Sequence, residues 1–172
     1  LLVDLDWSSR TIEFEQALCD LAWHLGLAGE RPERDTGRGP DDLWALTDGT
    51  YLVIEAKSGA KDSHPVYKND AKQLSNAMDW FRAEYPRASG VPVLIHPRPE
   101  FDKQAAVPTG CRVVTTERLA SLRGSVRGFS ISLAHDDAFR DPKKVLALLD
   151  SSHLRGDGII QRYSVRGRQL ST

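Results

Sequence analysis

Two charged residues at the end of an apolar segment are the clearest candidates for chemistry. Glu55 directly follows residues 51–54, an aromatic and β-branched run that predicts a buried strand, and Lys57 lies two positions later. Residues two apart on a strand share one face, so both side chains are expected on the same side. Because a buried charge is costly unless it is paired or bound to a metal, these charges indicate a functional site. A surface Glu–Lys pair beside a turn is the alternative without function.

An acidic pair, Asp41 and Asp42, precedes the neighbouring apolar segment, residues 43–46. If the two apolar segments form a hairpin around residues 47–50, which contain an Asp-Gly turn signal, their outer ends lie side by side. Asp41 then faces Glu55. Because Asp41 and Asp42 would point to opposite faces of their strand, either of them could be the acid that meets Glu55 and Lys57.

A cluster of two carboxylates and one ammonium has a definite chemical use. Two hard carboxylate oxygens suit Mg²⁺ or Mn²⁺, which takes one or two carboxylates together with waters and substrate phosphate. A lysine beside the metal can hold the attacking water and neutralise charge that develops on a phosphate. Without metal, the neighbouring carboxylates are expected to raise one apparent pKa.

Pro40-Asp41, followed by Glu55-Ala56-Lys57 at the end of a hydrophobic strand, resembles the signature of the PD-(D/E)-x-K nuclease superfamily. The resemblance implies an α/β restriction-endonuclease-like fold, in which a mixed central β-sheet is flanked by helices. It also implies Mg²⁺- or Mn²⁺-dependent hydrolysis of DNA, with Asp41 and Glu55 as metal ligands and Lys57 as a catalytic residue. The resembled motif favours Asp41 over Asp42. Two alternatives remain: an inactive nuclease-like module that binds nucleic acid or a partner protein, and an unrelated α/β protein with a chance motif.

A fourth candidate, Glu15, lies in a segment with helical periodicity, residues 10–25, for which Ser8 or Ser9 would be the N-cap. Glu15 falls at the edge of the apolar stripe of this helix, where a solvent-exposed glutamate is an equally good interpretation. In the resembled superfamily the first core helix often contributes a catalytic glutamate within a Phe-Glu pair. That resemblance favours Glu15 over Glu13.

Basic and amide side chains that could meet a nucleic acid follow Lys57 in the chain. Residues 58–65 predict a loop, and the apolar stripe of residues 67–85 predicts a long helix whose beginning is expected near Lys57. Some branches of the resembled superfamily use a glutamine on this helix, although an ordinary polar flank explains these side chains equally well. The nucleic-acid-binding candidates are Lys61, Lys68, Lys72 and Gln73.

The rest of the chain continues the alternation of helices and strands. Residues 30–39 are polar, and part of them is expected to form a first short strand. Strands are expected at 91–95 and 112–115, a helix from 116, and helices at 145–149 and 159–163. His96 follows one of these strands and is expected to be satisfied by local hydrogen bonds. The pattern predicts a single domain over 1–172, with a nuclease-like core at about 10–135 and a helical C-terminal extension at about 136–172.

Composition limits the class of protein. The chain has 172 residues, of which 40% are hydrophobic and 27% charged, without a membrane-spanning run or a signal pattern. Cys19 and Cys111 have no zinc spacing and are expected to be free core thiols of a cytoplasmic protein. The net charge of −1 leaves only local basic patches, including Arg162, Arg166 and Arg168, for binding DNA. A chain that begins at Leu1 suggests one module of a larger helicase- or ATPase-type defence or repair protein; such a motor, or a homodimer, would strengthen the grip on DNA.

Overall fold

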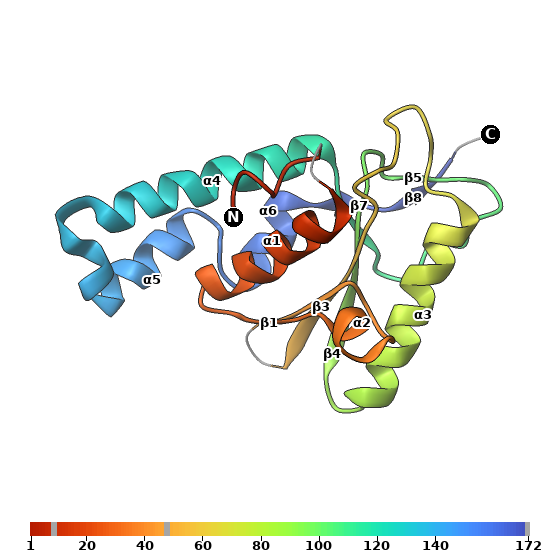
Figure 1. The fold of residues 1–172 in the computed structure, drawn as a ribbon, viewed down its shortest axis with the longest axis horizontal. Helices are drawn as coiled ribbons and strands as arrows, with labels where there is room; N and C mark the ends of the chain where they lie inside the picture. Colours follow the sequence, from red (N-terminus) through yellow and green to blue (C-terminus); the bar gives the residue numbers. More distant parts are fainter. Residues whose placement is uncertain (8–9, 47–48, 171–172) are drawn as a thin grey trace.

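A six-stranded mixed sheet lies at the centre of the computed structural model, which describes residues 1–7, 10–46 and 49–170 (Figure 1). The strand order is β1-β2-β3-β4-β6-β7: the first three strands pair antiparallel, β3, β4 and β6 run parallel, and β7 is antiparallel to β6. A separate small sheet pairs β5 with β8 in parallel. The strands are β1 Ala28–Glu30, β2 Asp42–Ala45, β3 Thr50–Ala56, β4 Ser89–Ile95, β5 Glu100–Phe101, β6 Arg112–Val114, β7 Val165–Arg166 and β8 Arg168–Gln169.

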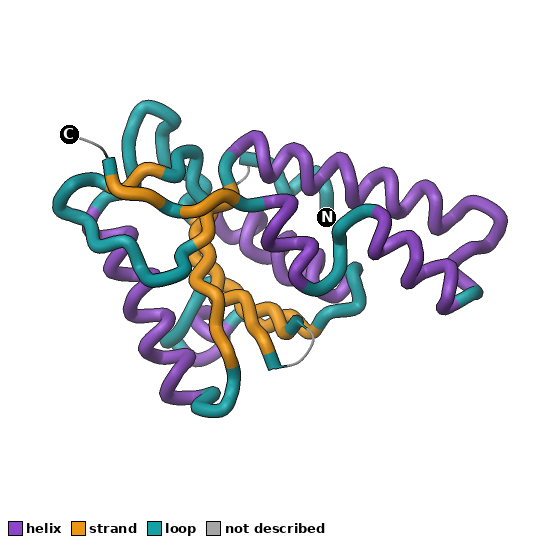
Figure 2. The backbone as a smooth tube through the Cα atoms, turned by 180° about the vertical axis from the view of Figure 1, so that it is seen from behind, coloured by secondary structure: helices purple, strands orange, loops and turns teal. Residues whose placement is uncertain are grey.

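Helices cover both faces of this sheet. α3 packs on one face, and α1, α4 and α6 pack on the other, while α4 and α5 extend beyond the sheet (Figures 1 and 2). The predicted α/β class and the flanking helices are therefore confirmed. The helices are α1 Thr11–His24, α2 Pro32–Thr36, α3 Lys68–Glu84, α4 Thr116–Ala134, the 3₁₀ helix η1 His135–Arg140, α5 Pro142–Ser151 and α6 Asp157–Tyr163.

The alternation of side chains along β3 determines which residues face which helices. Leu52, Ile54 and Ala56 belong to the core cluster under α1 and α4, whereas Val53 packs with residues of α3. Because side chains alternate along a strand, Glu55 falls on the α3 face together with Val53. The strand is apolar on both faces because helices cover both of them.

The predicted hairpin between the two carboxylate-bearing segments is present. β2 and β3 pair antiparallel, with Asp42 opposite Ile54 and Leu43 opposite Val53. Continuing this register by one residue brings Asp41 opposite Glu55. The tip of the predicted turn, residues 47–48, lies outside the described residues.

The segment before the hairpin differs from the prediction. A short strand was expected within residues 30–39, but the first strand, β1, occupies 28–30 and shares only Glu30 with that segment. Half of the polar segment forms the short helix α2 instead. Proline is favoured in a first helical turn, and Gly37 ends the helix in the left-handed conformation, with φ of 72°. The proposed caps Ser8 and Ser9 of the first helix lie outside the described residues, and Arg10 is the N-cap.

The C-terminal segment is only partly helical. α5 and α6 match the predicted helices, and the Asp141 side chain caps α5 by accepting a hydrogen bond from the Lys143 N–H at 2.9 Å. After α6, however, the chain returns to the central sheet as β7 and then forms β8. The core therefore extends beyond the predicted boundary near 135. Both cysteines are buried and free, as predicted, and no helix in the described part is long and apolar enough to cross a membrane.

Candidate functional site

Asp41 is fixed to the end of β3 by a buried hydrogen bond. Its Oδ2 accepts the backbone N–H of Ala56 at 2.7 Å, and the residue is 9% exposed. Because this bond crosses from the start of β2 to the end of β3, it sets the carboxylate beside Glu55 and Lys57. The relative position of these three residues is therefore the one predicted from the hairpin.

Glu55 and Lys57 form an ion pair on the same strand face. The Lys57 Nζ lies 3.2 Å from Oε2 of Glu55, and their side chains are 18% and 6% exposed, respectively. Burial raises the pKa of Glu55 to about 7, and the charge of Asp41 adds to this rise, while Lys57 opposes it. A raised carboxyl pKa was expected from the sequence, although burial contributes more to it than the neighbouring acid does.

Two cavities meet at these residues. The smaller, about 240 Å³, lies against α3 and is lined by Glu55 and Gln73, among others. The larger, about 550 Å³, reaches α1 and is lined by Glu15 and by the loop that follows β3. Asp41 and Lys57 line both cavities. Both side chains can therefore be reached from either cavity.

Glu15 points toward the site, whereas Glu13 does not. Glu15 forms a buried ion pair with Arg31, and the two side chains are 15% and 6% exposed. Burial raises the pKa of Glu15, and the charge of Asp41 raises it further, against the opposing effect of Arg31. Glu13 instead pairs with Arg10 on the surface. The structure thus places Glu15, and not Glu13, on the wall of the larger cavity. The resemblance to the nuclease superfamily likewise favoured Glu15 over Glu13.

Glu33 is a site residue that sequence reasoning missed. It lies on α2 and lines the smaller cavity with Asp41, Glu55 and Lys57. A hydrogen bond between the carboxyl groups of Glu33 and Asp41 is the main cause of the raised pKa of Glu33, followed by burial. Such a bond requires one of the two groups to carry a proton. The available signal was Pro32-Glu33, a proline and an acid typical of a first helical turn.

Asp42 lies on the opposite face of β2 and lines neither cavity. It is fully buried, and within the described ranges neither of its carboxyl oxygens has a hydrogen-bond partner. Burial raises its pKa well above the usual range, with Arg31 opposing and Asp41 adding to the rise. The Trp44 indole N–H lies near enough to lower this pKa but does not reach hydrogen-bond geometry. Asp41, not Asp42, is therefore the acid that meets Glu55 and Lys57.

The donor set fits a hard divalent cation. Asp41, Glu55 and Glu33 offer carboxylate oxygens on one small cavity. Burial of Glu55 and the hydrogen bond of Glu33 to Asp41 are the main causes of the raised pKa values of Glu55 and Glu33, and the negative charge of Asp41 raises both further. Within residues 1–7, 10–46 and 49–170, no three His, Cys, Asp or Glu side chains are arranged to hold a metal together. One or two carboxylates with waters are sufficient for Mg²⁺, so Asp41 and Glu55 are the pair that could hold it.

The candidate nucleic-acid contacts divide into two groups. Lys61 lines the larger cavity and Gln73 the smaller, whereas Lys68 and Lys72 are exposed on α3 and line neither. His96 lines the larger cavity but is almost fully buried, and its Nδ1 is within hydrogen-bond distance of the backbone of Arg98, as predicted for a satisfied histidine. The structure thus brings two of the four candidates to the carboxylates.

The site as a whole combines carboxylates that could hold a cation, a lysine and two adjoining cavities. Its hard oxygen donors have no thiolate among them, so the ligand chemistry favours Mg²⁺ or Mn²⁺ over zinc. Comparisons of the chain with protein-family models, with curated proteins and with solved structures returned no match.

Proposed function

We propose that the chain is a divalent-metal-dependent nuclease module that hydrolyses DNA phosphodiester bonds. The observation that carries the proposal is the meeting of Asp41, Glu55 and Lys57 where two cavities join, with Asp41 anchored to the β3 backbone. The mixed sheet with helices on both faces is compatible with a restriction-endonuclease-like fold, which forms part of the proposal.

Each residue has a distinct role in this reaction. Asp41 and Glu55 hold Mg²⁺ or Mn²⁺, which when bound would supply positive charge against the scissile phosphate. The Lys57 ammonium donates hydrogen bonds to the attacking water or to a phosphate oxygen, where negative charge develops. Glu15, on the larger cavity, accepts a hydrogen bond from the water and orients it. The water oxygen forms the new P–O bond and gives up a proton to the solvent, the bond to the leaving oxygen breaks, and that oxygen takes up a proton from the solvent.

In this proposal, the ion pair with Lys57 favours the ionised form of Glu55. A buried acid with a pKa of about 7 is only partly ionised at neutral pH, and Lys57 lowers that pKa toward the charged form. Lys57 therefore helps to keep Glu55 available as a metal ligand before metal binds. Once a cation compensates the carboxylate, the ammonium can turn toward the phosphate.

The proposal includes a cytoplasmic setting in a larger defence or repair protein. Lys61 and Gln73 would contact the strand beside the carboxylates, and Lys68 and Lys72 would contact it along α3. With a net charge of −1, the chain offers few contacts to DNA phosphates. A helicase or ATPase domain, or a second copy of the chain, would supply further contacts to DNA.

The decisive test is cleavage of plasmid and single-stranded DNA with and without Mg²⁺ or Mn²⁺. Lys57→Ala is the site variant, and Lys144→Ala, an exposed lysine of α5, is the matched control. We expect metal-dependent cleavage by the wild type and by Lys144→Ala, and none by Lys57→Ala. Binding of DNA without cleavage by the wild type would instead support an inactive nuclease-like module.

A further inference from the structure

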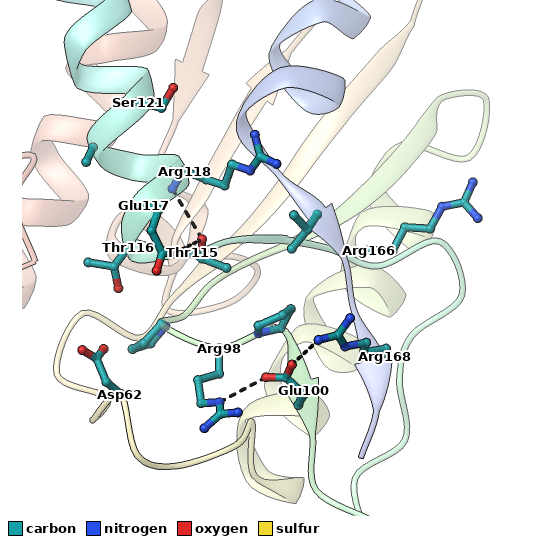
Figure 3. Close-up of a pocket in the computed structure, with 14 residues that line it drawn as sticks. Asp62, Arg98, Glu100, Thr115, Thr116, Glu117, Arg118, Ser121, Arg166 and Arg168 are labelled. Atoms are coloured by element: carbon teal, nitrogen blue, oxygen red, sulfur yellow. Dashed lines mark hydrogen bonds and ion pairs between the residues drawn. The ribbon is translucent and has the colours of Figure 1, made fainter. Parts of the chain in front are cut away.

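A cavity of about 940 Å³ lies beside the candidate site, and none of the roles proposed above uses it. It opens where β4 and β6 end, at the same edge of the sheet as Glu55 and Ala56, the last two residues of β3. Figure 3 shows the side chains that line it. Neighbouring residues of the same two loops line both cavities: Lys61 and His96 line the candidate-site cavity, and Asp62 and Pro97 line this one. The two cavities therefore adjoin.

Two arginines on one wall of this cavity are held by a single acid. Glu100 receives the Arg98 Nε on Oε2 at 3.1 Å and an Arg168 guanidinium nitrogen on Oε1 at 2.5 Å (Figure 3). The Glu100 side chain is 12% exposed, against 45% for Arg98 and 69% for Arg168. A sheltered carboxylate thus positions two outward-facing guanidiniums, and each guanidinium keeps further N–H donors for another acceptor.

The fold explains why these three residues meet. Glu100 and Arg168 are register partners in the small parallel sheet of β5 and β8, which joins segments far apart in the chain. The Arg168 N–H also bonds to the Pro99 carbonyl at 3.0 Å. Although burial raises the pKa of Glu100, the hydrogen bonds from Arg168 and Arg98 outweigh it and hold that pKa below its usual value. Glu100 therefore stays ionised, and the cluster carries one net positive charge.

Among the described residues, two further arginines nearby, Arg118 and Arg112, bond to uncharged oxygens and add to the positive field, which the acids Asp62 and Glu117 on the cavity wall offset in part. The Arg118 guanidinium bonds to the Arg162 carbonyl, and Arg112 bonds to the Ser164 hydroxyl and to the carbonyls of Ser164 and Ile160. Burial lowers the pKa of Arg112, and the charges of Arg166 and Arg118 lower it further. The field is opposite in sign to that at the candidate site, where acids outnumber bases.

We propose that the Arg98–Glu100–Arg168 cluster and its cavity bind the phosphodiester backbone of a nucleic acid strand beyond the phosphate at Lys57. The inference rests on the proposed function for the direction of the strand. A polyanion needs positive charge along its path, and this is the arginine-lined cavity that adjoins the carboxylates. Guanidiniums held as a planar fork are suited to phosphate oxygens.

The test measures binding of labelled oligonucleotides in EDTA by fluorescence anisotropy, so that it does not depend on cleavage. The site variant is Arg98→Gln/Arg168→Gln, and the matched control is Arg82→Gln/Arg87→Gln, at the opposite end of β4. We expect the site variant to lose roughly five- to tenfold in affinity for the oligonucleotide. The slope of log affinity against log salt concentration should become shallower by about 0.7–0.9 for each phosphate contact that is lost. The control should match the wild type.

Three further arms keep the result interpretable. Arg98→Gln/Glu100→Gln/Arg168→Gln, which leaves no unpaired acid, should behave like the double variant; wild-type affinity in this folded triple variant would overturn the inference. The loss should appear with an oligonucleotide of roughly 16 residues and vanish with a dinucleotide too short to reach both cavities. An equal loss with inorganic phosphate as the ligand would assign the cluster to free phosphate instead of a strand and would also overturn it. Cleavage by the wild type, measured separately, tests the proposed function whichever way binding turns out.

Discussion

The Asp41 carboxylate and the Ala56 backbone N–H are joined by a 2.7 Å hydrogen bond that ties the start of one strand to the end of the next. One carboxylate oxygen of Asp41 is thereby committed to the scaffold. This bond fixes the acid between Glu55 and Lys57, which flank Ala56 in the chain. A side chain that is already ordered loses less entropy when it binds a metal or a substrate, so the site is preorganised.

We predict that Asp41, and not Asp42, is needed for binding of a divalent cation. Asp41→Ala should abolish the binding of Mn²⁺ measured by titration calorimetry, because Asp41 is the aspartate on the cavity shared with Glu55. Asp42→Asn should retain it, since Asp42 lines neither cavity and its raised pKa favours a neutral side chain. The reverse pattern would move the ligand to the other face of β2.

Lys57→Ala is predicted to impair catalysis far more than folding. Removing a donor to the transition state typically costs on the order of 10²–10³-fold in rate. Because Lys57 also lowers the pKa of Glu55, the variant should need a higher pH for full Mn²⁺ affinity. Cleavage and calorimetry near pH 8 separate the two effects. A folded variant that binds Mn²⁺ and cleaves at the wild-type rate would exclude Lys57 from the chemistry.

The hairpin was predictable because its signals are local. Alternation along a strand sets Glu55 and Lys57 on one face, and an Asp-Gly turn between two apolar runs sets Asp41 beside them. Each inference needs only neighbouring residues. The main helices were predictable for the same reason, since a stripe such as that of α3 repeats over several turns.

The parts that were missed depend on contacts between distant segments. Glu33 lies on a helix of five residues, and β5 and β8 have two residues each, too short for any periodicity. The ion pair of Glu15 with Arg31 joins residues that no local pattern connects. Tertiary packing alone brings these residues to the site or to its neighbouring cavity.

Stability of the metal-free protein is predicted to fall as the pH rises toward neutral. Glu55 has a pKa of about 7 when folded, above the value of about 4.3 expected when unfolded, so the folded state binds more protons between these values. Raising the pH through this window therefore lowers the free energy of unfolding. Glu15 and Glu33, whose pKa values are also raised, act in the same direction.

Denaturant unfolding in EDTA at about pH 5 and about pH 8 measures this effect, at about 1.4 kcal/mol for each unit of pKa difference. Glu55→Gln, which has no charge to lose, should show a smaller difference between the two pH values. Adding Mn²⁺ should restore stability at the higher pH in the wild type but not in Glu55→Gln. Equal pH dependence in both proteins would show that Glu55 is not the group responsible.

The last prediction concerns the turn that presents Asp41. Gly39 has a φ of 97°, and a Cβ built there would lie 2.9 Å from side-chain atoms of both Pro32 and Trp80. Gly37 also has a positive φ, of 72°, but a Cβ there would meet nothing within 4 Å. Gly37→Ala should therefore cost only the backbone strain, about 1–2 kcal/mol, and leave Mn²⁺ binding unchanged.

Gly39→Ala should cost more, because Pro32 or Trp80 must move and the backbone that leads into Pro40 and Asp41 must move with it. We expect a lower melting temperature than in Gly37→Ala, together with weaker Mn²⁺ binding in the fraction that remains folded. Calorimetry and thermal unfolding of the two variants side by side separate general strain from displacement of the carboxylate. Wild-type Mn²⁺ affinity in Gly39→Ala would show that the position of Asp41 depends on its hydrogen bond to Ala56 and not on the turn.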